Sequence, residues 1–254
     1  MEFIESIKER NALLFWFGLA NLLVTVILVL FSYLKPIEYA GTNAWHKPIK
    51  FALSTSILAF SICWFSGYLP LDKDMNVASW VIIITLSFEV LYITLQASKG
   101  QASHYNQSSS FYSFMFTIMA LAASIATIAI GYVGLKFFIL PLNNIPEYYL
   151  WAIRLGFILF VFFSFEGFAM GAKMSHTVGA KDGGKGLPFL NWSVNHGDLR
   201  IAHFVGMHAL QVLPLLAWYL LKNTKLTLIV AAIYSLLAIF ILISALRGNT
   251  LIKM

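Results

Sequence analysis

The chain has 254 residues, of which 59% are hydrophobic and 11% charged, and its mean hydropathy is +0.79. A soluble domain has about 45–50% apolar and about 25% charged residues. The composition therefore excludes a cytosolic globular enzyme, a disordered chain and a nucleic-acid-binding domain, despite a formal net charge of +6. The single cysteine, Cys63, excludes an intramolecular disulfide and a cysteine-cluster metal site. We predict a polytopic helical membrane protein that contacts the lipid bilayer and no nucleic acid.

Seven stretches of the chain carry almost no charge. An ionisable group at the bilayer centre costs about 2.5–3.5 kcal/mol, and a membrane-spanning helix needs about 20 apolar residues. We therefore predict helices over residues 12–34, 49–69, 76–97, 111–135, 147–172, 199–221 and 226–246. Together they form an all-α, seven-transmembrane-helix bundle, a single integral membrane domain over residues 1–254. Because seven is odd, the N- and C-termini lie on opposite sides of the membrane.

This threading places every histidine on one side, which we call the histidine side. The six residues are His46, His104, His176 and His196, near helix ends, and His203 and His208, in the nearer half of the 199–221 helix. Ten lysines and arginines flank the membrane on this side and six on the other. The positive-inside rule then predicts a cytoplasmic histidine side, in the inner membrane if the cell is bacterial. Lys8 and Arg10, directly before the first helix, favour the reverse orientation.

Several ionisable and polar residues lie within the predicted spans, where such residues usually indicate function. In the 76–97 helix, Glu89 shares a stripe with Tyr92, Gln96 and Lys99, which leads from mid-membrane to the histidine side. In the 147–172 helix, Glu166 lies about two turns from the same side.

The 199–221 helix is the richest in polar groups. Arg200, His203 and Gln211 share one face, and His208 lies about 80° around the helix from them. Simpler explanations exist: a histidine near a helix end is tolerated as an interfacial residue, and a buried glutamic acid or histidine can make one interhelical hydrogen bond. Two acids and two histidines in the same half of the membrane nevertheless favour a functional site, since burying them is costly.

The histidine spacing does not identify a metal. His203 and His208 are five residues apart, about 140° around a helix, which differs from the His-x-x-x-His spacing of membrane zinc hydrolases. Imidazole with carboxylate suits zinc or iron, and haem with an axial histidine is also open. The glycine-rich segment 178–188 is predicted to be a flexible lid, whose exposed amides and lysines suit an anion.

We therefore expect a site open to the histidine side that binds a metal ion (Zn or Fe) or haem. The protein would act on, or exchange electrons with, a small or lipid-like substrate, as a membrane-embedded metalloenzyme (an oxidoreductase or hydrolase) or a redox protein. The metal ligands would be His203 and His208, with His104, His176 and His196 in reserve. Glu89, Glu166 and His208 would be catalytic, as ligands or proton carriers. Arg200 and Lys99 would hold a substrate anion, and Gln96 and Gln211 would support the cofactor.

Two other functions remain open from the sequence. In a proton-coupled transporter or channel, Glu89 and Glu166 would titrate and the histidines would form a vestibule. The polar residues stop halfway across the membrane, however, and this favours a closed-ended site over a conduit. The third possibility is a binding or assembly subunit without chemistry.

Overall fold

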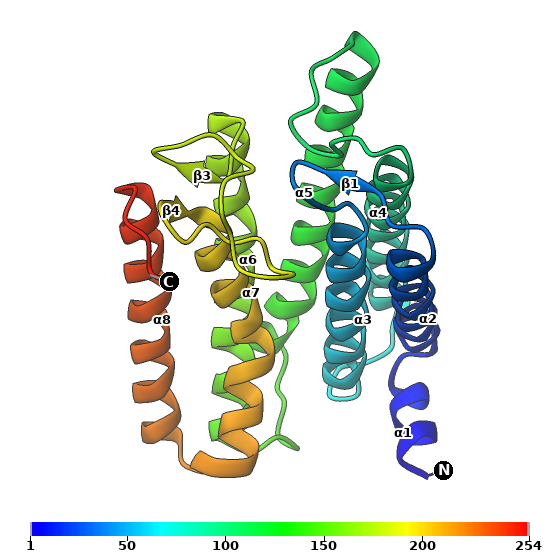
Figure 1. Cartoon of the computed structure of the whole chain (residues 1–254). Helices are drawn as coiled ribbons and strands as arrows, with labels where there is room; N and C mark the ends of the chain where they lie inside the picture. Colours follow the sequence, from blue (N-terminus) through cyan, green and yellow to red (C-terminus); the bar gives the residue numbers. More distant parts are fainter. Residues whose placement is uncertain (1, 253–254) are drawn as a thin grey trace. The chain divides into compact units, whose positions relative to one another are not determined.

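The computed structural model describes residues 2–252 and is almost entirely helical (Figure 1). Within that range, seven helices are long and apolar enough to cross a membrane, which confirms the predicted all-α, seven-span class. The elements are α1 (Glu2–Arg10), α2 (Ala12–Leu34), β1 (Glu38–Tyr39), β2 (Thr42–Asn43), α3 (His46–Ser66), α4 (Lys73–Ser98), α5 (Ser110–Ile139), α6 (Glu147–Lys173), β3 (Thr177–Val178), β4 (Gly197–Asp198), α7 (Leu199–Leu216), the π-helical turn η1 (Ala217–Leu221) and α8 (Thr224–Leu246). The protein is thus an integral membrane protein.

The spans follow the predicted ones to within four residues at each end, and α4 and α5 extend beyond their predicted limits, to Lys73 and Ile139. The helix predicted over residues 49–69 runs instead from His46 to Ser66, so His46 begins the helix rather than preceding it. The side chain of Asn43 accepts a hydrogen bond from the Trp45 backbone N–H just before this start. The sequence analysis did not predict α1 or the two short antiparallel strand pairs, β1–β2 and β3–β4.

The described part of the chain forms two compact units that divide between residues 129 and 130, inside α5. The single membrane domain predicted from the sequence stays a prediction. In the first unit, α2 and α3 pack side by side (Figure 1). The Ser56 hydroxyl donates to the Gly18 carbonyl over 2.7 Å, and the Asn11 amide donates to Ser79 Oγ over 2.9 Å. These buried hydrogen bonds tie α2 to α3 and to α4.

In the second unit, α6 and α7 approach each other unusually closely. A Cβ atom placed on Gly206 would lie 1.9 Å from the ring of Phe163, and one on Gly156 would lie 3.0 Å from the Cα atom of Leu210. The missing side chains therefore allow the two backbones to come together. On the other face of α7, the Tyr234 hydroxyl of α8 donates to the Val205 carbonyl over 2.6 Å. This packing brings the polar residues of α6 and α7 within reach of each other.

Large apolar side chains are exposed along the spans. Examples are Leu23 on α2, Leu91 on α4 and Leu236 on α8, each more than 60% exposed. Water would not stabilise so many exposed apolar side chains, whereas hydrocarbon does. These faces contact the lipid bilayer.

Candidate functional site

The close approach of α6 and α7 pairs a carboxyl group with an imidazole inside the membrane span. Glu166 Oε2 lies 3.3 Å from Nδ1 of His203, and the Glu166 side chain is almost completely buried. The ring of His203 packs over Gly167, where a Cβ atom would lie 3.4 Å from the ring. The two groups lie close without hydrogen-bond geometry, and neither oxygen of Glu166 has a hydrogen-bond partner among the described residues. Buried polar atoms normally have such partners, so this pair is poised to accept a further donor.

Glu166 also lines an apolar cavity of about 770 Å³ between the C-terminal part of α5, α6 and α8. The lining residues are Gly131, Gly134, Leu135, Phe138, Phe157, Ile158, Val161, Phe162, Phe165, Glu166, Ala169, Leu242 and Leu246. We call this cavity the α6 groove. Within this described set, Glu166 alone has a polar side chain. The groove therefore offers a long apolar surface with one carboxyl group, a combination that suits an amphipathic molecule.

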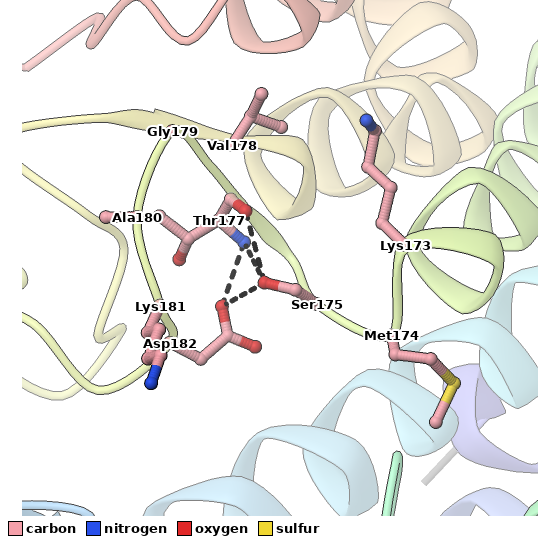
Figure 2. A pocket seen from close by; sticks show the side chains of 9 residues that line it. All are labelled: Lys173, Met174, Ser175, Thr177, Val178, Gly179, Ala180, Lys181 and Asp182. Carbon is pink, nitrogen blue, oxygen red and sulfur yellow. Dashed lines mark hydrogen bonds between the residues drawn. The ribbon is translucent and has the colours of Figure 1, made fainter.

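Beyond the end of α6, the chain folds back into a compact loop around Asp182. The Asp182 carboxylate accepts from the Ser175 hydroxyl over 2.8 Å and from the Thr177 backbone N–H over 2.9 Å, and its Oδ1 atom lies 2.9 Å from Nδ1 of His176. Ser175, Thr177 and Asp182, drawn in Figure 2, line a second cavity of about 460 Å³, which we call the loop pocket. Lys173 and Lys181 extend from opposite sides of the view.

Burial and the local hydrogen bonds set the charges in this loop. Burial lowers the pKa of His176 below its ordinary value, more than the nearby Asp182 carboxylate raises it, so the ring is neutral at neutral pH. Burial alone would raise the pKa of Asp182, but the hydrogen-bond donors of His176, Ser175 and Thr177 outweigh it and hold that pKa well below its ordinary range. Asp182 is thus a charged group that holds the loop through its hydrogen bonds, and His176 is one of its partners.

The start of α7 holds a buried ion pair. Asp198 caps the helix, and Arg200 Nε donates to its Oδ1 over 2.9 Å while a terminal guanidinium nitrogen lies 2.6 Å from Oδ2. The same guanidinium also donates to the Asn191 carbonyl. Arg200 was predicted to hold a substrate anion, and the structure shows its charge already balanced by Asp198. A pairing of this kind orders the loop before α7.

Of the remaining predicted residues of the second unit, His208 contacts its own helix backbone. Nδ1 of His208 lies 2.9 Å from the Phe204 carbonyl, one turn earlier, and its ring stacks on that of Phe204. Since a carbonyl only accepts, Nδ1 carries the proton and Nε2 keeps its lone pair. His196 lies in the loop before β4, and Gln211 is half-buried on α7.

The first unit contains a further group of polar residues, on α3, on α4 and in the connection to α5. The Lys47 ammonium group donates to Nδ1 of His104 over 3.1 Å, so Nε2 of that ring carries its proton. Glu89 on α4 is buried and lies within electrostatic range of Lys47. The Gln96 amide donates to the Ala102 carbonyl, which fixes the connection to α5, and Lys99 is exposed at the end of α4.

Among the described residues, no group of three or more His, Cys, Asp and Glu side chains is close enough to hold a metal ion. Lys47, Gly167, Asp182 and Asp198 take part in these contacts but were assigned no site role from the sequence. Asp198 had a recognisable signal, because an aspartate before an apolar helix is a typical N-cap. Asp182 had none, because its partners are set by the fold of the loop.

The chain matches no protein-family model, no curated protein and no solved structure. The geometry of the sites is therefore the basis for proposing a function.

Proposed function

We propose that this integral membrane protein binds an amphipathic, lipid-like molecule in the α6 groove and performs acid–base chemistry on its polar part with Glu166 and His203. One observation carries the proposal: the polar side chain of the groove is a carboxyl group whose oxygens lack hydrogen-bond partners in the described chain and which lies 3.3 Å from an imidazole.

The chemistry follows from these two groups. A carboxyl group and an imidazole exchange protons efficiently when they lie close together, and a neighbouring imidazole orients the carboxylate. The low-polarity surroundings strengthen a hydrogen bond from a bound hydroxyl or ammonium group to Glu166. The apolar wall supplies binding free energy in proportion to the chain length buried. The site thus suits a molecule with a hydrocarbon chain and a hydrogen-bond donor.

The binding part of this proposal is tested with a monoacylglycerol that carries a mid-chain diazirine, in phosphatidylcholine nanodiscs containing the whole protein. We expect light-induced labelling of peptides that contain Phe162 on α6 and Leu242 on α8. Ala169→Trp should fill the groove and reduce this labelling about tenfold. Ala232→Trp is the matched control, since it makes the same change at an exposed position on α8. Equal labelling of both variants and the unmodified protein would refute groove binding.

The chemical part is tested by infrared difference spectroscopy of the same nanodiscs. Adding the monoacylglycerol should shift the carboxyl or carboxylate bands of Glu166, because a new donor changes its hydrogen bonding. Glu166→Gln should remove the signal, whereas Glu147→Gln, at the other end of α6, should leave it unchanged. A signal that persists in Glu166→Gln would show that Glu166 is not the group that receives the ligand.

A metal or haem site is a second candidate, favoured by the 3.3 Å approach of a carboxylate oxygen and an imidazole nitrogen, both ligand types for zinc and iron. Elemental analysis and a visible absorption spectrum of the purified protein test it. A stoichiometric metal or haem that is lost in His203→Ala and reduced in His208→Ala is expected from this candidate. Full occupancy in both variants, or no bound metal in the unmodified protein, would reject it.

A further inference from the structure

We propose that the loop pocket binds the phosphate group of an anionic lipid whose hydrocarbon chain occupies the α6 groove. The inference rests on the proposed function, because it names the class of amphiphile that the groove receives. Its basis is the succession of the two cavities along α6, together with the lysines that line the second one.

The register of α6 connects the cavities. Glu166 and Ala169 line the α6 groove, and Lys173 lines the loop pocket. Residues seven apart lie on the same face of an α-helix, and the rise of about 1.5 Å per residue separates Glu166 from Lys173 by about 10 Å along the axis. One face of α6 therefore leads from the apolar groove, past the carboxyl group, to a lysine at the helix end.

The end of α8 joins the same region. Leu242 and Leu246 line the groove, and Arg247 follows directly. The Gly197 N–H donates to the Gly248 carbonyl over 2.9 Å, which ties the end of α8 to β4. A Cβ atom on Gly248 would lie 3.5 Å from the Val178 carbonyl, in the wall of the loop pocket. Two of the three helices that border the groove, α6 and α8, thus end beside this pocket.

The charges around the pocket favour an anion. Lys173, Lys181 and Arg247 form no ion pair with an acid in the part of the chain that is described. Of the nearby acids, Asp198 pairs with Arg200, and the Asp182 carboxylate accepts hydrogen bonds from the loop. The cavity of about 460 Å³ is thus lined by two lysines and one carboxylate, so positive charge is in excess.

The position of the two cavities matches an anionic lipid. The groove lies within membrane spans, whereas the loop pocket lies just past the last residue of α6. In a bilayer the phosphate groups lie at this interface and attract basic side chains, and the chains lie below them. The carboxyl group of Glu166, about 10 Å deeper, would then meet the upper part of the lipid rather than its phosphate.

The test compares phosphatidic acid with diacylglycerol, each with the same diazirine chain, in phosphatidylcholine nanodiscs that contain the whole protein. We expect phosphatidic acid to label the α6 groove about tenfold more than diacylglycerol at equal mole fraction. Lys173→Gln combined with Lys181→Gln should reduce this ratio to about one and leave labelling by diacylglycerol unchanged. Lys222→Gln combined with Lys225→Gln, at the other end of the unit, is the matched control and should keep the ratio.

The outcomes separate the two proposals. Groove labelling by both lipids without a preference for phosphatidic acid would overturn the phosphate inference and leave the proposed function standing. Labelling of the groove by neither lipid would overturn both. Inorganic phosphate, tested separately, should protect Lys173 and Lys181 from acetylation only weakly. Strong protection by inorganic phosphate without a lipid preference would show a site for free phosphate and reject the lipid.

Discussion

At the scale of single residues, the polar groups of the second unit fall into two kinds. Asp182, Asp198 and Arg200 are fully engaged with neighbouring groups and order the loop between α6 and α7. Glu166 and His203 lie together without satisfying each other. A protein stabilised only by packing would have little use for the second arrangement, because a buried polar group without a partner costs about 1–3 kcal/mol. This contrast is why we assign function to Glu166 and structure to Asp182.

The structural role of Asp182 gives a first prediction. Asp182→Asn replaces one acceptor oxygen with a donor and should lower the free energy of opening the loop by about 2 kcal/mol. Cleavage by trypsin after Lys181 should then become about 30-fold faster, provided that opening is in equilibrium. Cleavage after Lys222, in the connection before α8, is the internal control. An unchanged rate after Lys181 would show that the carboxylate does not hold the loop.

The loop should also loosen in acid. The folded loop keeps His176 neutral and so lowers its pKa, and protonation therefore favours the open loop once the pH falls below the ordinary histidine value of about 6.5. Because the closed loop also lowers the pKa of Asp182, the closed loop loses further stability as the pH falls below the ordinary aspartate value of about 3.9. Amide exchange of residues 175–182, corrected for intrinsic rates, should show falling protection between pH 7.5 and pH 5.5. His176→Gln should remove this dependence, and its persistence would assign it to another group.

At the scale of elements, the glycines of α6 and α7 allow these two helices to approach closely enough for their polar side chains to meet. Gly206 and Gly156 bring the backbones of α6 and α7 together, and Gly167 leaves room for the ring of His203. Small residues have this role in membrane helices because close packing replaces the hydrophobic effect that is absent in lipid. The Glu166–His203 pair therefore depends on residues that carry no polar group.

Gly206→Ala should destabilise the protein by about 1–3 kcal/mol, because the new methyl group would overlap the ring of Phe163, which is completely buried. Thermal unfolding in detergent measures the effect as a lower Tm. Gly171→Ala is the control on the same helix pair: a Cβ atom there meets nothing within 4 Å, and alanine favours the helix. A Tm for Gly206→Ala equal to or above that of Gly171→Ala would contradict the packing described here.

At the scale of the whole molecule, seven spans fix on which side of the membrane each connection lies. The β1–β2 connection, the α4–α5 connection and the loop between α6 and α7 should all lie on the histidine side. The proposed lipid site needs this arrangement within its own unit, since the loop pocket must be at the interface where lipid phosphates lie.

Cysteine labelling tests the threading. Glu38→Cys, Gln107→Cys and Gly184→Cys should react with an impermeant maleimide from one side of sealed vesicles. Leu71→Cys and Asn144→Cys should react from the other. These positions are exposed, and the native Cys63 is buried and gives little background. Reaction of any one of the first three from the side that labels Asn144→Cys would break the seven-span topology.

The sequence by itself determined the class of the protein and the limits of its spans. This was possible because each charged residue adds its own free-energy cost of transfer into hydrocarbon. Charge-free stretches therefore indicate membrane-spanning helices without any knowledge of how the helices pack. For the same physical reason, Glu89, Glu166 and His203 are costly residues within the membrane. The order of the seven spans predicts that the six histidines lie on one side, which the labelling experiment addresses.

Only the tertiary structure decided which of these groups meet. Glu166 and His203 come together because glycines bring α6 and α7 into close contact, whereas His208, five residues further on, turns to its own backbone at Phe204. Lys47 reaches His104 across 57 residues of sequence. Such pairs depend on the rotation of each helix and on the distance between helix axes, and periodicity along one helix determines neither. Packing between helices therefore decides which polar groups meet, and the composition of each helix decides that it spans the membrane.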